Sequence, residues 1–87
     1  MDKRIFVLKT QIGLPTQLIR VLISFENEDY QRPIQIAKKL DLHPSAVSNY
    51  LKKLCDRGYV YLMNPDYHIP RLYRLTEKGK RILKNIN

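Results

Sequence analysis

An 87-residue chain with 44% hydrophobic and 28% charged residues has the composition of one ordinary folded domain, which excludes an intrinsically disordered protein. Its single cysteine excludes an internal disulfide and any multi-cysteine zinc or iron–sulfur site. No apolar run approaches the roughly 18 residues of a membrane span, and the apolar stretch at the start is too short for a signal peptide. We therefore expect a cytoplasmic protein with no membrane contact.

The net charge of +8 is unevenly distributed along the chain. Residues 1–50 hold 7 Lys and Arg against 5 Asp and Glu, whereas residues 51–87 hold 9 against 3. A basic C-terminal half is typical of proteins that bind a polyanion, because Lys and Arg neutralise phosphates and release counterions. Excess lysine also keeps proteins soluble, and the charge alone does not separate these two interpretations.

Residues 1–14 fit two local structures equally well. Ile5 and Val7 alternate as in a short strand, whereas Phe6 and the residues after it fit a frayed helix. We separate this N-terminal arm, a possible dimerisation element, from a domain at residues 15–87.

Two amphipathic helices are predicted after the arm. The first begins at Pro15, because the first helical position does not need the N–H that proline lacks, and it ends in the polar run of residues 26–30. The second is shorter and begins at Pro33. Their apolar residues recur at three- and four-residue spacing, as on one face of a helix: Leu18, Ile19, Leu22 and Ile23 in the first, and Ile36, Ala37 and Leu40 in the second.

Residues 41–43 leave room only for a tight turn before a third helix, which starts at Pro44. The inner face of this helix is marked by three apolar residues at i, i+4 and i+7: Val47, Leu51 and Leu54. Gly58 ends the helix, because glycine enters the left-handed conformation without steric cost. Tyr59 is then expected to pack back on Leu54.

A β-hairpin and a last helix complete the chain. The runs at residues 59–63 and 72–75 are rich in strand-forming residues, and a segment with two prolines separates them. Thr76 is a good N-cap for the last helix, although Gly79 lowers its helix propensity. Two apolar residues supply its main contacts: Ile82 and Leu83.

This order of elements predicts an α+β, mainly α fold: a winged helix-turn-helix with a three-helix core, a β-hairpin wing and a C-terminal helix. Four segments carry a family resemblance: Ile36–Leu40, Ser45–Leu54, Arg57–Val60 and Tyr73–Gly79. On these segments the chain resembles the winged helix-turn-helix of MarR-like and ArsR-like transcriptional regulators. The resemblance covers about residues 15–85.

The turn departs from the pattern of these families at two positions. Asp41 stands where they usually carry glycine, and aspartate can also enter the left-handed region. His43 stands where they carry a serine or threonine cap, and histidine caps a helix less well, so the start of the third helix stays open. The cysteine and histidine pairs of metal-sensing ArsR-like proteins are missing, and two histidines are too few to hold a metal.

The resemblance implies that the helix at about residues 44–57 enters the major groove of double-stranded DNA, with the wing at about residues 59–75 on the flanking groove or backbone. Asn49 suits adenine, Ala46 suits a thymine methyl group, and the serines suit bases or phosphates. Lysines of the helix suit phosphates, which position a protein without reading sequence. The candidate DNA-binding residues are Ser45, Ala46, Ser48, Asn49, Lys52 and Lys53 in the helix, and His68, Arg71 and Arg74 in the wing.

Several polar residues also have a plainer interpretation. Ser48 and Asn49 are also found on solvated helix faces, but within this motif contact with DNA is the favoured interpretation. Lys38 and Lys39 fit the outer face of the second helix better than a close phosphate contact. Cys55 fits a small packing residue better than a redox sensor, because the chain offers no partner thiol.

The predicted function is that of a sequence-specific double-stranded DNA-binding transcriptional regulator. A homodimer is expected, because one small domain buries little surface on DNA. Apolar residues of the arm and the last helix are the candidate interface: Phe6, Ile12, Ile82 and Ile86. The alternative is a winged-helix protein–protein interaction module of transcription or replication machinery. Without paired carboxylates, a Ser/His/Asp set or a glycine-rich phosphate loop, we expect no enzyme activity, no cofactor and no clear small-molecule effector.

Overall fold

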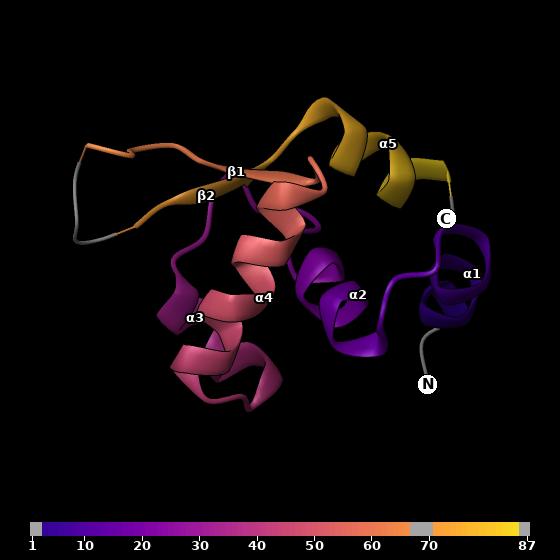
Figure 1. The fold of residues 1–87 in the computed structure, drawn as a ribbon, viewed down its shortest axis with the longest axis horizontal. Coiled ribbons are helices and arrows are strands. Elements are labelled where there is room, and N and C mark those ends of the chain that lie inside the picture. The colour runs from indigo at the N-terminus through magenta and orange to yellow at the C-terminus, as the bar shows by residue number, and fades with distance from the viewer. Residues whose placement is uncertain (1–2, 67–70, 86–87) are drawn as a thin grey trace.

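The computed structural model describes residues 3–66 and 71–85. Within these ranges there are five helices and two strands, in this order: α1 (Lys3–Ile12), α2 (Thr16–Ile23), α3 (Pro33–Leu40), α4 (Pro44–Asp56), β1 (Val60–Leu62), β2 (Tyr73–Leu75) and α5 (Glu77–Asn85). The hairpin extends to one side of the helices, and α1 lies at the opposite end of the molecule (Figure 1). The predicted mainly helical winged helix-turn-helix is confirmed. None of the described helices is long and apolar enough to cross a membrane.

The hydrophobic core lies between α2, α3 and α4. The residues of the three predicted apolar stripes that are buried to 4% exposure or less are Leu18, Ile19, Leu22, Ile36, Ala37, Val47, Leu51 and Leu54. Ile23 and Leu40 are partly buried against the same cluster. The helical spacing of the apolar residues therefore identified the inner faces of all three helices.

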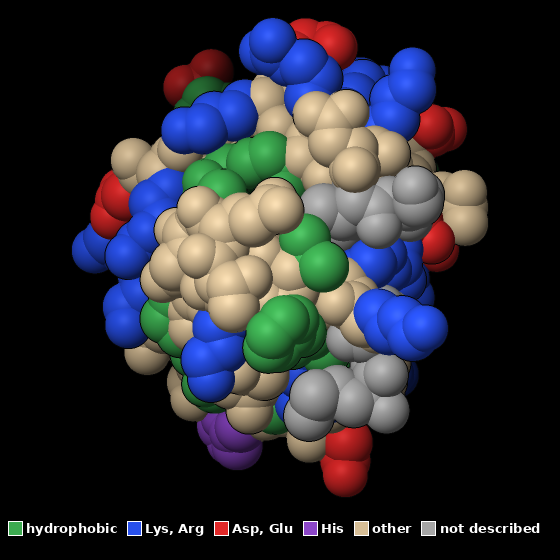
Figure 2. Space-filling model, turned by 90° about the vertical axis from the view of Figure 1, so that its right-hand side faces the viewer, with side chains coloured by type: hydrophobic (Ala, Val, Ile, Leu, Met, Phe, Trp, Pro, Cys, Tyr) green, Lys and Arg blue, Asp and Glu red, His purple; other side chains and the backbone are tan. Residues whose placement is uncertain are grey.

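The N-terminal arm is a helix, so the strand alternative is wrong. A helical repeat turns Leu8 into the core at 1% exposure, whereas Phe6 stays 68% exposed. Ile5 is half-buried against the core, and Leu14 in the link to α2 is fully covered. Figure 2 views this end of the molecule and shows apolar side chains at the surface between basic ones.

The prolines mark the helix starts almost as predicted. α3 and α4 begin at Pro33 and Pro44, as expected. α2 begins one residue later than predicted, at Thr16, because Pro15 has an extended ψ of 149° and forms the N-cap instead.

The turn between α3 and α4 accommodates both unusual residues. Asp41 adopts the left-handed conformation, with φ 54° and ψ 51°, as its residue type predicted. His43 is the N-cap of α4, and its Nδ1 accepts a hydrogen bond of 3.2 Å from the backbone N–H of Ser45. The same ring nitrogen lies 2.8 Å from the Ser45 hydroxyl. The His43 imidazole therefore caps the helix in place of the usual serine or threonine hydroxyl, and it defines the start of α4.

Gly58 and Gly79 place the wing against the helices. Gly58 has φ 80° and ends α4 in a Schellman motif, in which its own N–H bonds to the Cys55 carbonyl and the Tyr59 N–H bonds to the Leu54 carbonyl. Gly79 lies so close to the strand that an added Cβ would be 2.3 Å from the Tyr59 carbonyl oxygen. The glycine that weakens α5 on propensity is thus the residue that lets α5 approach the backbone of Tyr59, just before β1.

The wing is a two-stranded antiparallel sheet with an additional bridge. β1 pairs with β2 in a register that places Tyr61 opposite Arg74 and Leu62 opposite Tyr73. On the other edge of β2, Gln31 forms an isolated antiparallel bridge with Tyr73, through two backbone hydrogen bonds of 2.9 Å. Sequence reasoning missed this bridge, because a single paired residue has no strand periodicity.

Candidate nucleic-acid interface

The outer face of α4 carries the residues predicted to contact DNA. Because Val47, Leu51 and Leu54 turn into the core, the helical repeat directs the intervening side chains outward. Ala46 is half-buried, and the other five are exposed: Ser45, Ser48, Asn49, Lys52 and Lys53. Within the described ranges, the side chains of Ser48, Asn49 and Lys52 form no hydrogen bond or ion pair, whereas the Ser45 hydroxyl contacts the His43 ring.

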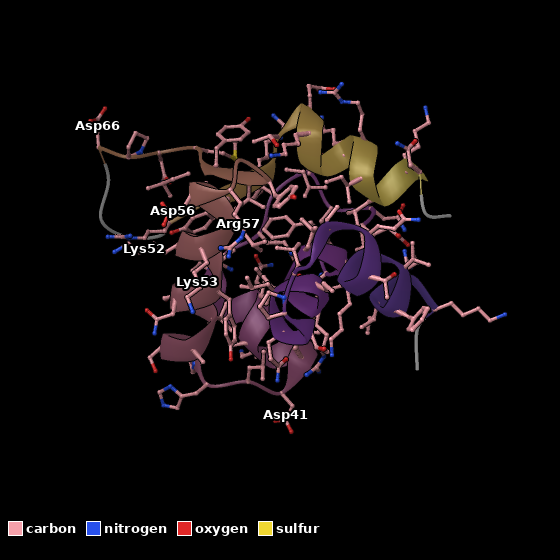
Figure 3. The ribbon with its side chains drawn as sticks, turned by 45° about the vertical axis from the view of Figure 1, so that its right-hand side comes forward. Asp41, Lys52, Lys53, Asp56, Arg57 and Asp66 are labelled. Atoms are coloured by element: carbon pink, nitrogen blue, oxygen red, sulfur yellow. The ribbon has the colours of Figure 1, made fainter. Side chains whose placement is uncertain are left out.

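A groove of about 420 Å³ separates α4 from the wing. Its described lining comes from Ser48, Asn49, Lys52 and Cys55 on α4, and from Leu62, Arg71 and Tyr73 on the wing. Figure 3 shows Lys52 extending from α4 on the side of the hairpin. The tertiary structure therefore brings Arg71 beside three of the predicted residues of the helix.

The electrostatics of this groove favour an anion. Lys52 and Arg71 are cationic, and none of the described lining residues is acidic. Two cations on facing walls repel each other unless a negative group lies between them. The groove can therefore hold an extended anion such as a phosphodiester strand, with the amide and hydroxyl of Asn49 and Ser48 beside it.

The two remaining wing residues of the prediction lie elsewhere. Arg74 is half-buried on β2, and its Nε donates a hydrogen bond of 3.0 Å to the backbone carbonyl of Asp29. Successive strand residues face opposite sides of a sheet, so Arg74 does not share the groove-lining side of Tyr73. The structure thus brings Arg71 to the groove but not Arg74. His68 lies outside the described residues.

Three groove residues were missing from the sequence prediction: Cys55, Leu62 and Tyr73. The alternation of side chains along the two strands could have identified Leu62 and Tyr73, since they form one cross-strand pair on one side of the sheet. Burial, with a smaller contribution from Asp56, raises the pKa of the Cys55 thiol, which favours its neutral form. This agrees with a packing role for a half-buried cysteine.

The lysines of α3 differ from each other. Lys38 is exposed, and no partner is recorded for it within the described ranges. Lys39 donates hydrogen bonds to the side chains of Glu28 and Gln31. Lys39 therefore stabilises the fold from the outer face of its helix.

A family model described as "Winged helix-turn-helix" matches residues 18–87. The chain belongs to the winged helix-turn-helix family. The match leaves out residues 1–17, which contain α1 and the first two residues of α2.

This winged helix-turn-helix protein is similar to the HTH-type transcriptional regulator MntR of Oceanobacillus iheyensis, with 40% identity over 57 residues. That alignment covers 66% of the chain and 35% of the relative. The chain therefore spans about a third of the length of this curated relative.

Among solved structures, a mutant MarR from E. coli complexed with operator DNA superposes with a TM-score of 0.78 and 23% identity, covering 98% of the chain and 61% of MarR. The transcriptional regulator Tm0710 from Thermotoga maritima gives a TM-score of 0.80 and 20% identity, covering 97% and 58%. Reduced AbfR bound to DNA gives a TM-score of 0.79 and 21% identity, covering 97% and 62%. At these identities the likeness is one of fold, and it confirms the predicted MarR-like architecture.

Proposed function

We propose that this protein is a sequence-specific regulator of transcription that binds double-stranded DNA. The observation that carries the proposal is the groove lined by Lys52 of α4 and Arg71 of the wing, together with Ser48 and Asn49, whose described lining contains no acidic residue. Similar folds in the MarR and AbfR structures were solved with DNA.

In the proposed complex α4 occupies the major groove and divides the contacts by side-chain chemistry. Asn49 pairs with the N6 and N7 atoms of an adenine, and Ala46 contacts a thymine methyl group. Ser48 and Ser45 bond bases or phosphates near the start of the helix. Lys52 and Lys53 contact phosphates, which orient the helix without reading sequence.

The wing adds contacts on the flanking groove or backbone. Arg71 neutralises a phosphate across the groove from α4. Arg74 has its Nε committed to the Asp29 carbonyl, so only the two terminal nitrogens of its guanidinium serve the DNA backbone. His68 completes the proposed set of wing residues.

The regulator acts as a homodimer in this proposal. A single module of this kind covers few base pairs, and two modules give the specificity that an operator requires. The apolar side chains left at the α1 end support a self-contact there, since Phe6 is 68% and Ile12 is 37% exposed while Ile82 of α5 is half-buried.

Selection of bound duplexes from a random pool, followed by titration of the selected duplex at increasing salt, tests the proposal. We expect a selected sequence with two symmetric half-sites. We also expect the logarithm of the binding constant to fall with the logarithm of salt concentration, with a slope of about 0.9 per neutralised phosphate. Weak binding that does not depend on salt or on sequence contradicts the proposal.

A further inference from the structure

A buried polar residue joins the wing to the helices. Gln31, in the link between α2 and α3, is only 1% exposed. Its backbone N–H and carbonyl both bond to Tyr73 of β2, each at 2.9 Å. Tyr73 lines the groove two residues after Arg71, so Gln31 holds the first residue of the strand that follows this arginine.

The side chain of Gln31 is held on two sides. Its Nε2 donates to the Ser24 hydroxyl at 3.2 Å, at the end of α2. Its Oε1 accepts a hydrogen bond of 2.6 Å from the Nζ of Lys39 on α3. Lys39 also reaches Glu28 at 3.1 Å, which fixes the position of its ammonium group. Gln31 thus connects three elements: its side-chain amide bonds to the end of α2 and to α3, and its backbone bonds to β2.

The Gln31 amide at the centre of this network is buried, whereas Lys39 and Glu28 are exposed. Removal of Lys39 or Ser24 as a partner therefore leaves the buried amide short of a hydrogen bond. A two-stranded hairpin is marginally stable by itself, so its direction depends on such attachments. Without the Gln31 network, β2 keeps its pairing with β1 and the bond from Arg74 to Asp29, but loses its fixed link to α3.

We propose that Gln31, held by Lys39, is a positioning residue for DNA binding, which fixes the wing so that Arg71 faces α4 across the groove. The inference rests on the proposed function, since it concerns a phosphate contact of Arg71. A preorganised arginine loses less conformational freedom on binding than one on a mobile hairpin. Gln31 itself touches no DNA in this arrangement.

The variants separate positioning from general stability. Gln31→Leu keeps a similar volume and removes the hydrogen bonds of the amide. Lys39→Met removes the contact to Gln31, and Lys38→Met is its matched control, because it removes the same charge from the neighbouring exposed position. Arg71→Gln and Lys52→Gln remove the two cations of the groove.

The first measurement is amide hydrogen exchange without DNA. The Tyr73 N–H bonds to the Gln31 carbonyl, so we expect its exchange to accelerate about tenfold or more in Gln31→Leu and Lys39→Met, and to stay unchanged in Lys38→Met. The Tyr59 N–H at the end of α4 is the internal reference. Equal Tyr73 exchange in Lys39→Met and Lys38→Met overturns the proposal even if Gln31→Leu fails to fold.

The second measurement is a double-mutant cycle on the selected duplex. We expect Gln31→Leu to lower the affinity for the duplex by about fivefold in the otherwise unchanged protein. In a protein that already carries Arg71→Gln, the same substitution should cost far less affinity. With Lys52→Gln, the two losses of affinity should multiply as for independent sites. If the affinity losses of Gln31→Leu and Arg71→Gln also multiply as for independent sites, the positioning role is wrong, while the DNA-binding function stands. A wild-type protein without salt-dependent binding overturns the function itself, and the positioning role with it.

Discussion

A methyl group added to Gly79 would lie 2.3 Å from the carbonyl oxygen of Tyr59. The contact is with backbone, so no side chain can rotate away from it, and α5 would have to shift away from Tyr59. Helix propensity alone predicts the opposite effect, because alanine is better than glycine in a helix by about 1 kcal/mol.

We therefore expect Gly79→Ala to destabilise the protein by about 2 kcal/mol or more, as overpacking outweighs the propensity gain. Thermal and urea unfolding followed by circular dichroism measure the change. Lys80→Ala, one residue further along α5 and exposed, is the control and is expected to change the stability by less than about 0.5 kcal/mol. A raised melting temperature in Gly79→Ala contradicts the close approach of α5 to Tyr59.

Truncation of Asn49 and truncation of Lys52 are expected to change DNA binding in different ways. Asn49→Ala removes about 1–3 kcal/mol of discrimination at one base pair, which relaxes the selected sequence at that position. Lys52→Ala weakens binding to all sequences and lowers the salt slope by about one. Repeating the selection and the salt titration on each variant separates the two effects.

The control for both variants is Lys84→Ala on α5, which removes a charge from an exposed residue outside the groove lining. Its selected sequence and its salt slope are expected to match those of the unchanged protein. If Asn49→Ala and Lys52→Ala give identical changes in both readouts, the division between base reading and phosphate contact is wrong.

Phe6 tests the proposed self-contact at the α1 end. Because its side chain is 68% exposed, Phe6→Ser is expected to leave the fold intact and to shift the dimer–monomer equilibrium toward monomer by about tenfold or more. Sedimentation equilibrium measures the shift. Lys9→Ser on the same helix is the control, and an unchanged dimer constant in Phe6→Ser places the interface elsewhere.

Cys55 offers a chemical test of the groove. Burial raises the pKa of its thiol, so the reactive thiolate is depleted in the folded state near neutral pH. Alkylation by iodoacetamide at pH 8 is expected to be slower in the folded protein than in the urea-unfolded chain. Bound DNA should slow it further, because Cys55 lines the groove.

The sign of the pH effect follows from the same shift. The raised pKa in the folded state contributes stability that is complete at neutral pH and is lost as the pH rises through the thiol range, where the unfolded chain ionises first. Cys55→Ala is expected to remove this part of the alkaline loss. An alkylation rate that is equal in the folded and unfolded protein contradicts the half-buried placement.

The amino-acid sequence alone predicted the helices of the core, the end of α4 and the hairpin. These features depend on neighbours in the chain: apolar residues at helical spacing, prolines at helix starts, and a glycine that takes φ 80° after α4. Such local preferences act before any tertiary contact forms, so they can be predicted without knowledge of the tertiary structure. The outer face of α4 follows from its inner stripe by geometry alone.

The conformation of the N-terminal arm and the positions of the wing side chains depend on tertiary contacts. The arm is a helix because this conformation buries Leu8 in the core, and no local sequence pattern could show that contact. Arg71 and Arg74 are only three residues apart in the chain, yet one lines the groove and the other bonds to Asp29. The network of Gln31 extends to Tyr73, which is distant in the chain, and its bonds form only once folding buries the amide and removes water as the competing partner.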